Sequence, residues 1–201
     1  MKKLFNIFLA TALFSACSKD NSPQPEPDKL PDATMVGANK AGCYINGELL
    51  LPKNGSQSFG GPPLYGLNYY YGNNFYPNKN DYWQLEIANK LDSNSKGIVL
   101  WIKNMQTGNG DYVIGQSNGE LNSSGPANNQ VIAGIKKNGV NKTYYSSPNS
   151  GIIKITRSDL GPGISTYSGV FNCTLYNKDN PNETIIVSDG RFDINSLTLN
   201  N

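Results

Sequence analysis

Apolar and polar residues alternate with a period of two through most of the chain beyond residue 40. In residues 83–88 (WQLEIA) this alternation predicts a strand with one buried face. The continuous apolar run at 97–103 predicts a central strand that is covered on both faces. The pair Asn46-Gly47, a strong two-residue turn signal, predicts a hairpin. Further strands are predicted at 112–114, 131–137, 152–156, 166–176, 184–187 and 191–194, with a turn at 188–190.

These segments amount to about ten short strands, separated by loops rich in Asn and Gly, and no segment carries a helical period. Within 166–176, Gly169 is a candidate β-bulge. Regularly spaced short strands and turns favour antiparallel architectures over alternating strands and helices. We therefore expect an all-β fold, either an antiparallel β-sandwich or a barrel-like meander.

The N-terminus, MKKLFNIFLATALFSAC, has the layout of a secretory signal peptide that ends in a cysteine. Its apolar stretch of about 11 residues is far shorter than the ~20 that a membrane-spanning helix needs. Ser15, Ala16 and Cys17 match a bacterial lipobox, with Phe14 where Leu is usual. We expect cleavage before Cys17 and lipidation of Cys17; the alternative is an ordinary secretory signal that is cut after Ala16.

Residues 18–33 (SKDNSPQPEPDKLPDA) contain four prolines and no aromatic residue, which is typical of a semi-extended tether. The expected organisation is a signal peptide at 1–16, a lipidated cysteine and tether at 17–33, and a single β domain at 34–201. The expected location is the cell envelope, on the outer membrane. Ser18-Lys19-Asp20 resembles the short signal that sends Bacteroidetes lipoproteins to the cell surface, and the sequence leaves surface exposure open.

The formal net charge of +2 belongs to the signal peptide, because its removal leaves 15 basic residues against 15 acidic ones. The sequence contains no run of basic residues, so we do not expect it to bind nucleic acid. Histidine is absent, which excludes Ser-His-Asp and Cys-His catalysis in their usual form and the common His-containing zinc sites. We expect no cofactor and no metal. Cys43 and Cys173 lie in predicted strands and could pair in an oxidising compartment; the alternative is two separate buried thiols.

Four segments, GCYINGELLLP, GIIKITRSD, YSGVFNCTLYN and VSDGRFDI, carry a resemblance to known proteins. The chain resembles the uncharacterised Bacteroidetes lipoprotein domains, in which a lipoprotein signal precedes an x-Ile/Val-Asn-Gly hairpin and later Gly-x-Phe and Gly-Arg-Phe strands. The resemblance covers most of 40–195 and implies a fold and a location. It implies no activity.

Residues 59–83 are unusually aromatic, with nine aromatic side chains among 25 residues. Adjacent strand residues face opposite sides, so Tyr69-Tyr70-Tyr71 should expose at least one ring. Tyr and Trp rings suit stacking on sugars or protein partners. The alternative is that these rings pack the core. The candidate ligand-binding residues are Tyr65, Tyr69, Tyr71, Phe75, Tyr76 and Trp83.

Two further groups of residues bear on function. The segment 177–183 (NKDNPNE) has the oxygen ligands that Ca²⁺ uses, although an ordinary hairpin turn explains it better. Carboxylates could serve a glycosidase-like enzyme only if two of them share a cleft. We therefore expect a non-catalytic, lipid-anchored module that binds carbohydrate through the aromatic segment. The alternatives are a structural or protein-interaction component of the envelope, and a carboxylate-dependent hydrolase.

Overall fold

The chain forms one open antiparallel sheet of eleven strands within the residues that the structure describes. A computed structural model describes residues 28–57, 60–72, 82–91, 94–105, 108–159 and 166–201. The strands are β1 (Lys40–Ile45), β2 (Glu48–Leu50), β3 (Leu67–Gly72), β4 (Tyr82–Asn89), β5 (Lys96–Lys103), β6 (Gly110–Val113), β7 (Gln130–Lys137), β8 (Val140–Tyr145), β9 (Gly151–Ser158), β10 (Thr166–Asn177) and β11 (Thr184–Asn195). The expectation of an all-β antiparallel fold is confirmed.

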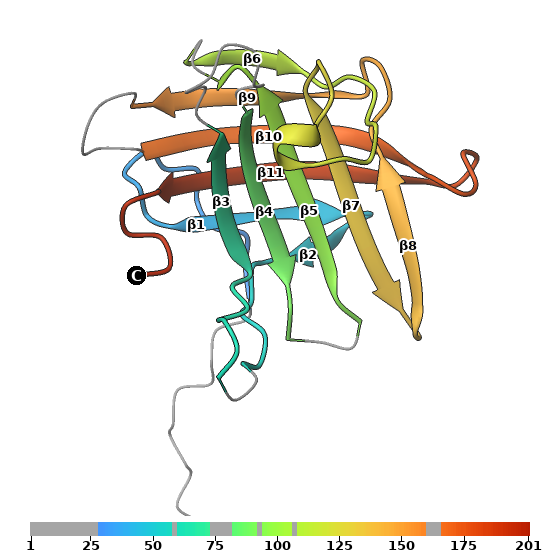
Figure 1. Cartoon of the computed structure of the whole chain (residues 1–201), viewed down its shortest axis with the longest axis horizontal. Helices are drawn as coiled ribbons and strands as arrows, with labels where there is room; N and C mark the ends of the chain where they lie inside the picture. Colours follow the sequence, from blue (N-terminus) through green and yellow to red (C-terminus); the bar gives the residue numbers. More distant parts are fainter. Residues whose placement is uncertain (1–27, 58–59, 73–81, 92–93, 106–107, 160–165) are drawn as a thin grey trace, which may run out of the picture.

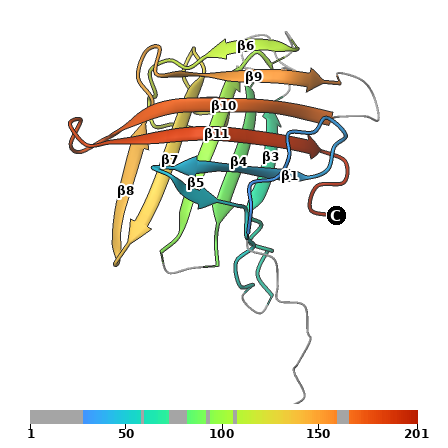
Figure 2. The same ribbon diagram turned by 180° about the vertical axis from the view of Figure 1, so that it is seen from behind.

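The sheet divides into two layers whose strands cross (Figures 1 and 2). The back layer has the order β2-β1-β11-β10-β9-β6, and the front layer has the order β8-β7-β5-β4-β3. The long strand β10 belongs to both layers, because 167–173 pair with β9 whereas Tyr176 and Asn177 pair with β8. This shared corner makes the molecule an open, crossed sandwich. Such crossed packing is one of the two common solutions for stacked sheets.

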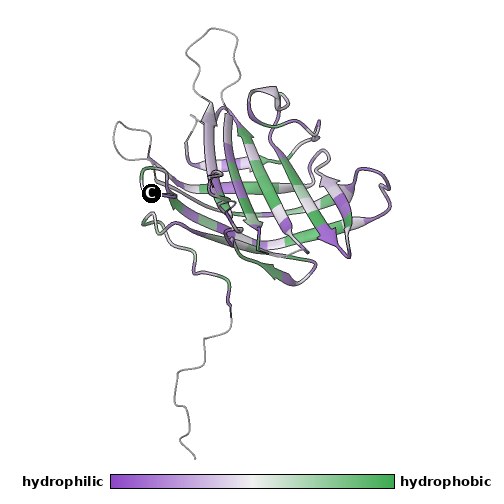
Figure 3. Ribbon diagram, turned by 60° about the horizontal axis from the view of Figure 1, so that its bottom comes forward, coloured by the Kyte–Doolittle hydropathy of each residue, from purple (hydrophilic) through white to green (hydrophobic). Residues whose placement is uncertain are grey.

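The core lies between the two layers and follows the alternation of the strands. The fully buried residues there include Leu85 and Ile87 of β4, and Ile98 and Leu100 of β5. Figure 3 shows that hydrophobic residues lie mainly on the strands. The prediction of a central strand at 97–103 is confirmed, since β5 lies between β4 and β7. Trp101 points to the opposite face of β5 and is buried under the segment 114–129, where its indole nitrogen donates a hydrogen bond to the Asn122 carbonyl at 3.1 Å.

The predicted hairpin at Asn46-Gly47 joins β1 to β2, and both turn residues have the positive φ angles that such a turn needs. A register shift between β9 and β10 also lies at Ser168 and Gly169, but its extra residue, Thr156, is on β9, so Gly169 lies opposite the bulge and not on it. Strand β8 was not predicted, because its segment VNKTYY contains polar residues on its exposed face and at its start.

The predicted turn at 188–190 is wrong, because β11 runs without interruption from Thr184 to Asn195. The Ser-Asp-Gly signal instead marks a β-bulge, where β11 carries one extra residue relative to both β1 and β10. Asp189 has a φ of 52°, and Gly190 packs so closely on Phe171 that an added Cβ would lie 2.4 Å from the ring. Residues that commonly form turns therefore form a bulge here, and the chain does not reverse direction.

Candidate functional site

The described aromatic side chains of this segment face both sides of the front layer, and Tyr82 stacks on Trp101 on the outer side. On β3, Tyr69 and Tyr71 pack against the core, and only the intervening Tyr70 is 43% exposed. Trp83 on β4 is fully buried. Tyr65 lies just before β3 and is half-buried. The remaining two candidates, Phe75 and Tyr76, lie outside the described residues.

Ring-to-ring contacts occupy the faces that a sugar would need. Tyr69 stacks on Tyr167 with 5.4 Å between ring centroids, and Trp83 lies 5.3 Å from Phe192. Burial raises the pKa of Tyr69 above its ordinary value, and a hydrogen bond with the Tyr167 side chain raises it further. These rings join β3 and β4 to the back layer. Tyr69, Tyr71 and Trp83 therefore pack in the core, which is the alternative to ligand binding for these three rings.

Cys43 and Cys173 are two buried free thiols, the second of the arrangements expected from the sequence. Strand β11 lies between β1 and β10, so two strand spacings, roughly 9–10 Å, separate the strands that carry the cysteines. A disulfide needs Cα atoms within about 7 Å. Burial raises the pKa of the Cys43 thiol to about 12, and burial and the neighbouring Cys43 raise that of Cys173.

The segment 177–183 is a tight turn between β10 and β11, in which Glu183 forms ion-pair and hydrogen-bond contacts with protein groups. Its carboxylate accepts hydrogen bonds from Lys142 at 2.8 Å, Tyr144 at 2.6 Å and Asn177 at 3.0 Å. These bonds, Lys142 first, lower the pKa of Glu183 to about 2. Protein donors therefore surround the carboxylate where a Ca²⁺ ligand would have to be free. Among the described residues, no group of three or more His, Cys, Asp or Glu side chains could hold a metal ion.

Two further carboxylates form ion pairs with neighbouring basic side chains. Glu86 pairs with Lys90 at 2.9 Å, and Asp159 pairs with Arg157 at 2.7 Å.

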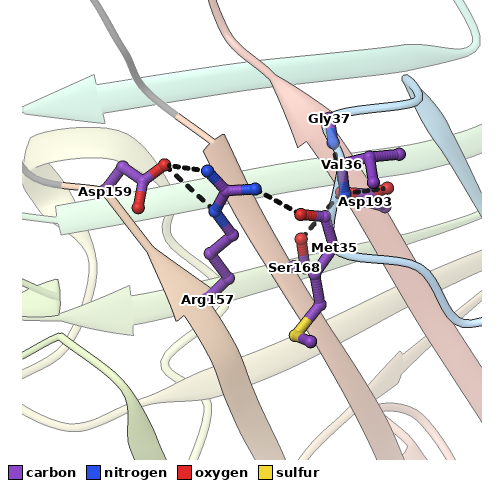
Figure 4. Close-up of polar contacts among 7 residues, drawn as sticks. All are labelled: Met35, Val36, Gly37, Arg157, Asp159, Ser168 and Asp193. Atoms are coloured by element: carbon purple, nitrogen blue, oxygen red, sulfur yellow. Dashed lines mark hydrogen bonds and ion pairs between the residues drawn. The ribbon is translucent and has the colours of Figure 1, made fainter.

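Asp193 forms a clamp that fastens the segment 34–38 to the sheet (Figure 4). The side chain points to the outer face of β11, where the N-terminal segment covers it, and Asp193 is only 2% exposed. Its carboxylate accepts hydrogen bonds from the Thr34 hydroxyl at 2.6 Å and from the Ser168 hydroxyl at 2.7 Å. It also accepts bonds from the backbone N–H groups of residues 36, 37 and 38, at 3.0, 2.8 and 3.2 Å.

Arg157 completes this clamp from β9, which pairs with β10 on the side away from β11. Its guanidinium donates to the Met35 carbonyl and to the Asp159 carboxylate (Figure 4). Burial alone would raise the pKa of Asp193, but the bonds from Thr34, Ser168 and the backbone prevail and lower it to about 2. The clamp therefore holds the entry point of the domain with a carboxylate that stays ionised at neutral pH.

A hollow of about 460 Å³ lies on the outer face of the front layer, below the segment 114–129. We call it the outer-face hollow. Its floor is a cross-strand row of small residues, Ala88, Gly97, Gly134 and Thr143, each paired with the next on β4, β5, β7 and β8. One wall is the parallel row Glu86, Val99 and Ile132; the opposite wall carries Lys90, Ser95, Lys136 and Asn141.

Five lysines surround this end of the molecule. They line the outer-face hollow or a neighbouring cavity of about 260 Å³ at the mouth between the layers, beside three carboxylates. Each carboxylate pairs with one lysine: Glu48 with Lys96, Glu86 with Lys90, and Glu183 with Lys142. In the part of the chain that the structure describes, Lys136 and Lys137 have no ion pair. No sequence pattern predicts this hollow, because its residues come together only through the register of four strands.

Neither a protein-family model, nor a curated protein, nor a solved structure matches the chain. Within the described residues, no helix has the length and apolar character needed to cross a membrane.

Proposed function

We propose that the protein is a non-catalytic binding module of the cell envelope, held on the outer membrane by lipid on Cys17. The observation that carries the proposal is the connection of a lipobox and a proline-rich tether to a domain that clamps its own entry segment. The sequence supplies Cys17 and the tether at 18–33. The Asp193 clamp holds the residues that follow directly, 34–38.

This arrangement suits a domain held at a distance from a membrane. Sixteen residues in a polyproline conformation reach up to ~50 Å. A pull on the tether reaches the domain at 34–38, where four hydrogen bonds from this segment to Asp193 resist its separation from β11. The clamp would therefore protect the fold against force from the anchor.

The non-catalytic part of the proposal is supported by the roles of the described acids. Asp193 and Glu183 accept several protein hydrogen bonds, and their pKa values are lowered rather than raised. A general acid at neutral pH needs a raised pKa. These carboxylates are therefore suited to structure and poorly suited to proton transfer.

A protein-interaction role is the second candidate, and the edge of the front layer favours it. Strand β3 is the last strand of this layer, and Tyr70 is exposed on it. An edge strand can pair with an added strand from a partner. Co-purification of a partner that is lost on substitution of Tyr70 would favour this role.

Lipid labelling tests the anchoring directly. In a Gram-negative host grown with alkyne-palmitate, the wild-type chain should be labelled and should sediment with membranes. Cys17→Ser should abolish both, whereas Ser15→Ala, which keeps a small residue before the cysteine, should preserve them. Equal labelling and sedimentation of the Cys17→Ser variant would contradict the proposal.

A further inference from the structure

We propose that the outer-face hollow binds a segment of an acidic polysaccharide. The inference deepens the proposed binding function, on which it rests for the location of the protein in the envelope. It also moves the ligand site away from the aromatic segment, whose described rings Tyr69, Tyr71 and Trp83 pack against the core.

The hollow has the size and shape for a short stretch of a linear polymer. The Glu86–Lys90 ion pair covers the floor at Ala88, so the open part from Gly97 to Thr143 spans three strands at ~4.8 Å spacing and is roughly 10 Å long. The volume of about 460 Å³ falls within the usual range of ligand sites. The floor is open in the middle, because a Cβ added to Gly134 would have no atom within 4 Å. A ligand could therefore approach the backbone of β7 closely.

The lining combines an apolar strip with hydrogen-bonding groups. Val99 and Ile132 lie side by side on one wall and offer a surface for the C–H face of a sugar ring. Asn141 and Ser95 on the opposite wall offer both donors and acceptors, which suit hydroxyl groups. Apolar surface with a few convergent polar groups is the usual composition of a small-molecule site.

The charge of the lining selects an acidic chain over a neutral one. Four lysines line the hollow against one carboxylate, Glu86, and two of these lysines pair with carboxylates that lie outside the lining. Lys136 stands on the wall of the hollow with no ion pair among the described residues. Its ammonium can therefore bind a sugar carboxylate without first breaking a salt bridge.

Calorimetric titration of the lipid-free chain starting at Ser18, which contains every described residue, tests this inference. The probe is a tetramer of galacturonic acid, with a neutral galactose tetramer for comparison and phosphatidylglycerol vesicles as an alternative anionic surface. We expect saturable binding of the acidic tetramer, weaker binding at higher salt, and affinity for the neutral tetramer lower by about tenfold or more.

Two variants locate the site. Gly134→Val fills the floor and should lower affinity by about tenfold, whereas Thr156→Val on the exposed face of β9 should leave it unchanged. Lys136→Gln should lower affinity by about fivefold or more, whereas Lys154→Gln, which removes the same charge from β9, should change it by less than about twofold.

The inference is overturned if the acidic tetramer does not bind, or if Gly134→Val and Lys136→Gln bind it as the wild type does. Equal affinity for both tetramers, or binding to vesicles alone, also overturns it. Because the titration uses the lipid-free chain, a negative result leaves the anchoring of Cys17 untouched. Loss of anchoring, in turn, would be seen only in the labelling experiment.

Discussion

At the scale of single residues, Asp193 is the side chain that joins the start of the domain to its last two strands. It accepts five hydrogen bonds, from Thr34, Ser168 and three backbone N–H groups. Its carboxylate lies on the solvent-facing side of β11, where the alternating pattern alone would place an exposed residue. The sequence could not indicate its burial, because the cover comes from a segment about 155 residues earlier in the chain.

Replacement of Asp193 should destabilise the domain at neutral pH. Asp193→Asn removes the charge and turns an NH₂ group toward N–H donors, so we expect a loss of about 2 kcal/mol or more in chemical denaturation. Asp189→Asn, an exposed acid on the same strand, is the matched control and should change stability little. Equal stabilities of the two variants would contradict the clamp.

The same carboxylate should make stability depend on acid pH. Its pKa is about 2 in the folded chain and about 3.9 in an unfolded one, so its contribution is complete above pH 4 and is lost as the pH falls toward 2. Denaturation midpoints measured across this range should fall more steeply for the wild type than for Asp193→Asn. Parallel curves would rule out this role of Asp193.

The two buried cysteines should behave as protected thiols. Because burial raises their pKa values, a thiol reagent at pH 8 should react slowly with the folded, lipid-free chain. After denaturation without a reductant, two thiols per chain should react rapidly. Reaction of none in the denatured chain would show that Cys43 and Cys173 form a disulfide.

At the scale of strands, the period-two pattern predicted most of the elements, and its failures have local physical causes. Around 188–190 the residues that favour a turn instead form a bulge, because Asp189 tolerates a positive φ and Gly190 fits against Phe171. A turn and a bulge favour the same residue types, so the sequence alone does not distinguish them. Pairing with the neighbouring strands on both sides of 188–190 makes this segment a bulge.

Close packing at this bulge should make Gly190 sensitive to a single added carbon. Gly190→Ala places its Cβ against the Phe171 ring and should cost about 1–3 kcal/mol of folding free energy. Gly134→Ala on β7 meets open space and should be neutral or slightly stabilising. Thermal unfolding of the two variants gives the comparison, and a neutral Gly190→Ala would contradict the packing described.

Strands β3 and β4 should contribute to stability mainly through their inward rings. Trp83→Ala leaves a large cavity between the layers and should cost about 3–5 kcal/mol, whereas Tyr70→Ala on the outer face should cost about 1 kcal/mol or less. Urea denaturation distinguishes them. A stable Trp83→Ala variant would mean that this ring is available for binding after all.

At the scale of the whole molecule, the sequence predicted the class of fold but not the crossing of the two layers. That crossing depends on β10, which pairs with β9 along most of its length and with β8 at its end. The outer-face hollow was hidden for a related reason. Ala88, Gly97, Gly134 and Thr143 are ordinary strand residues until the registers of four strands align them in one row.

We propose that the ligand site lies on the outer face of the front layer and not on the aromatic segment. Amide chemical-shift mapping of the ¹⁵N-labelled, lipid-free chain, titrated with the galacturonic acid tetramer, tests this most directly. We predict shifts that centre on Gly97, Gly134 and Thr143 and leave Tyr69 and Trp83 unchanged. Shifts centred on Tyr69 and Trp83, or no shifts at saturating tetramer, would show that the ligand does not bind in the outer-face hollow.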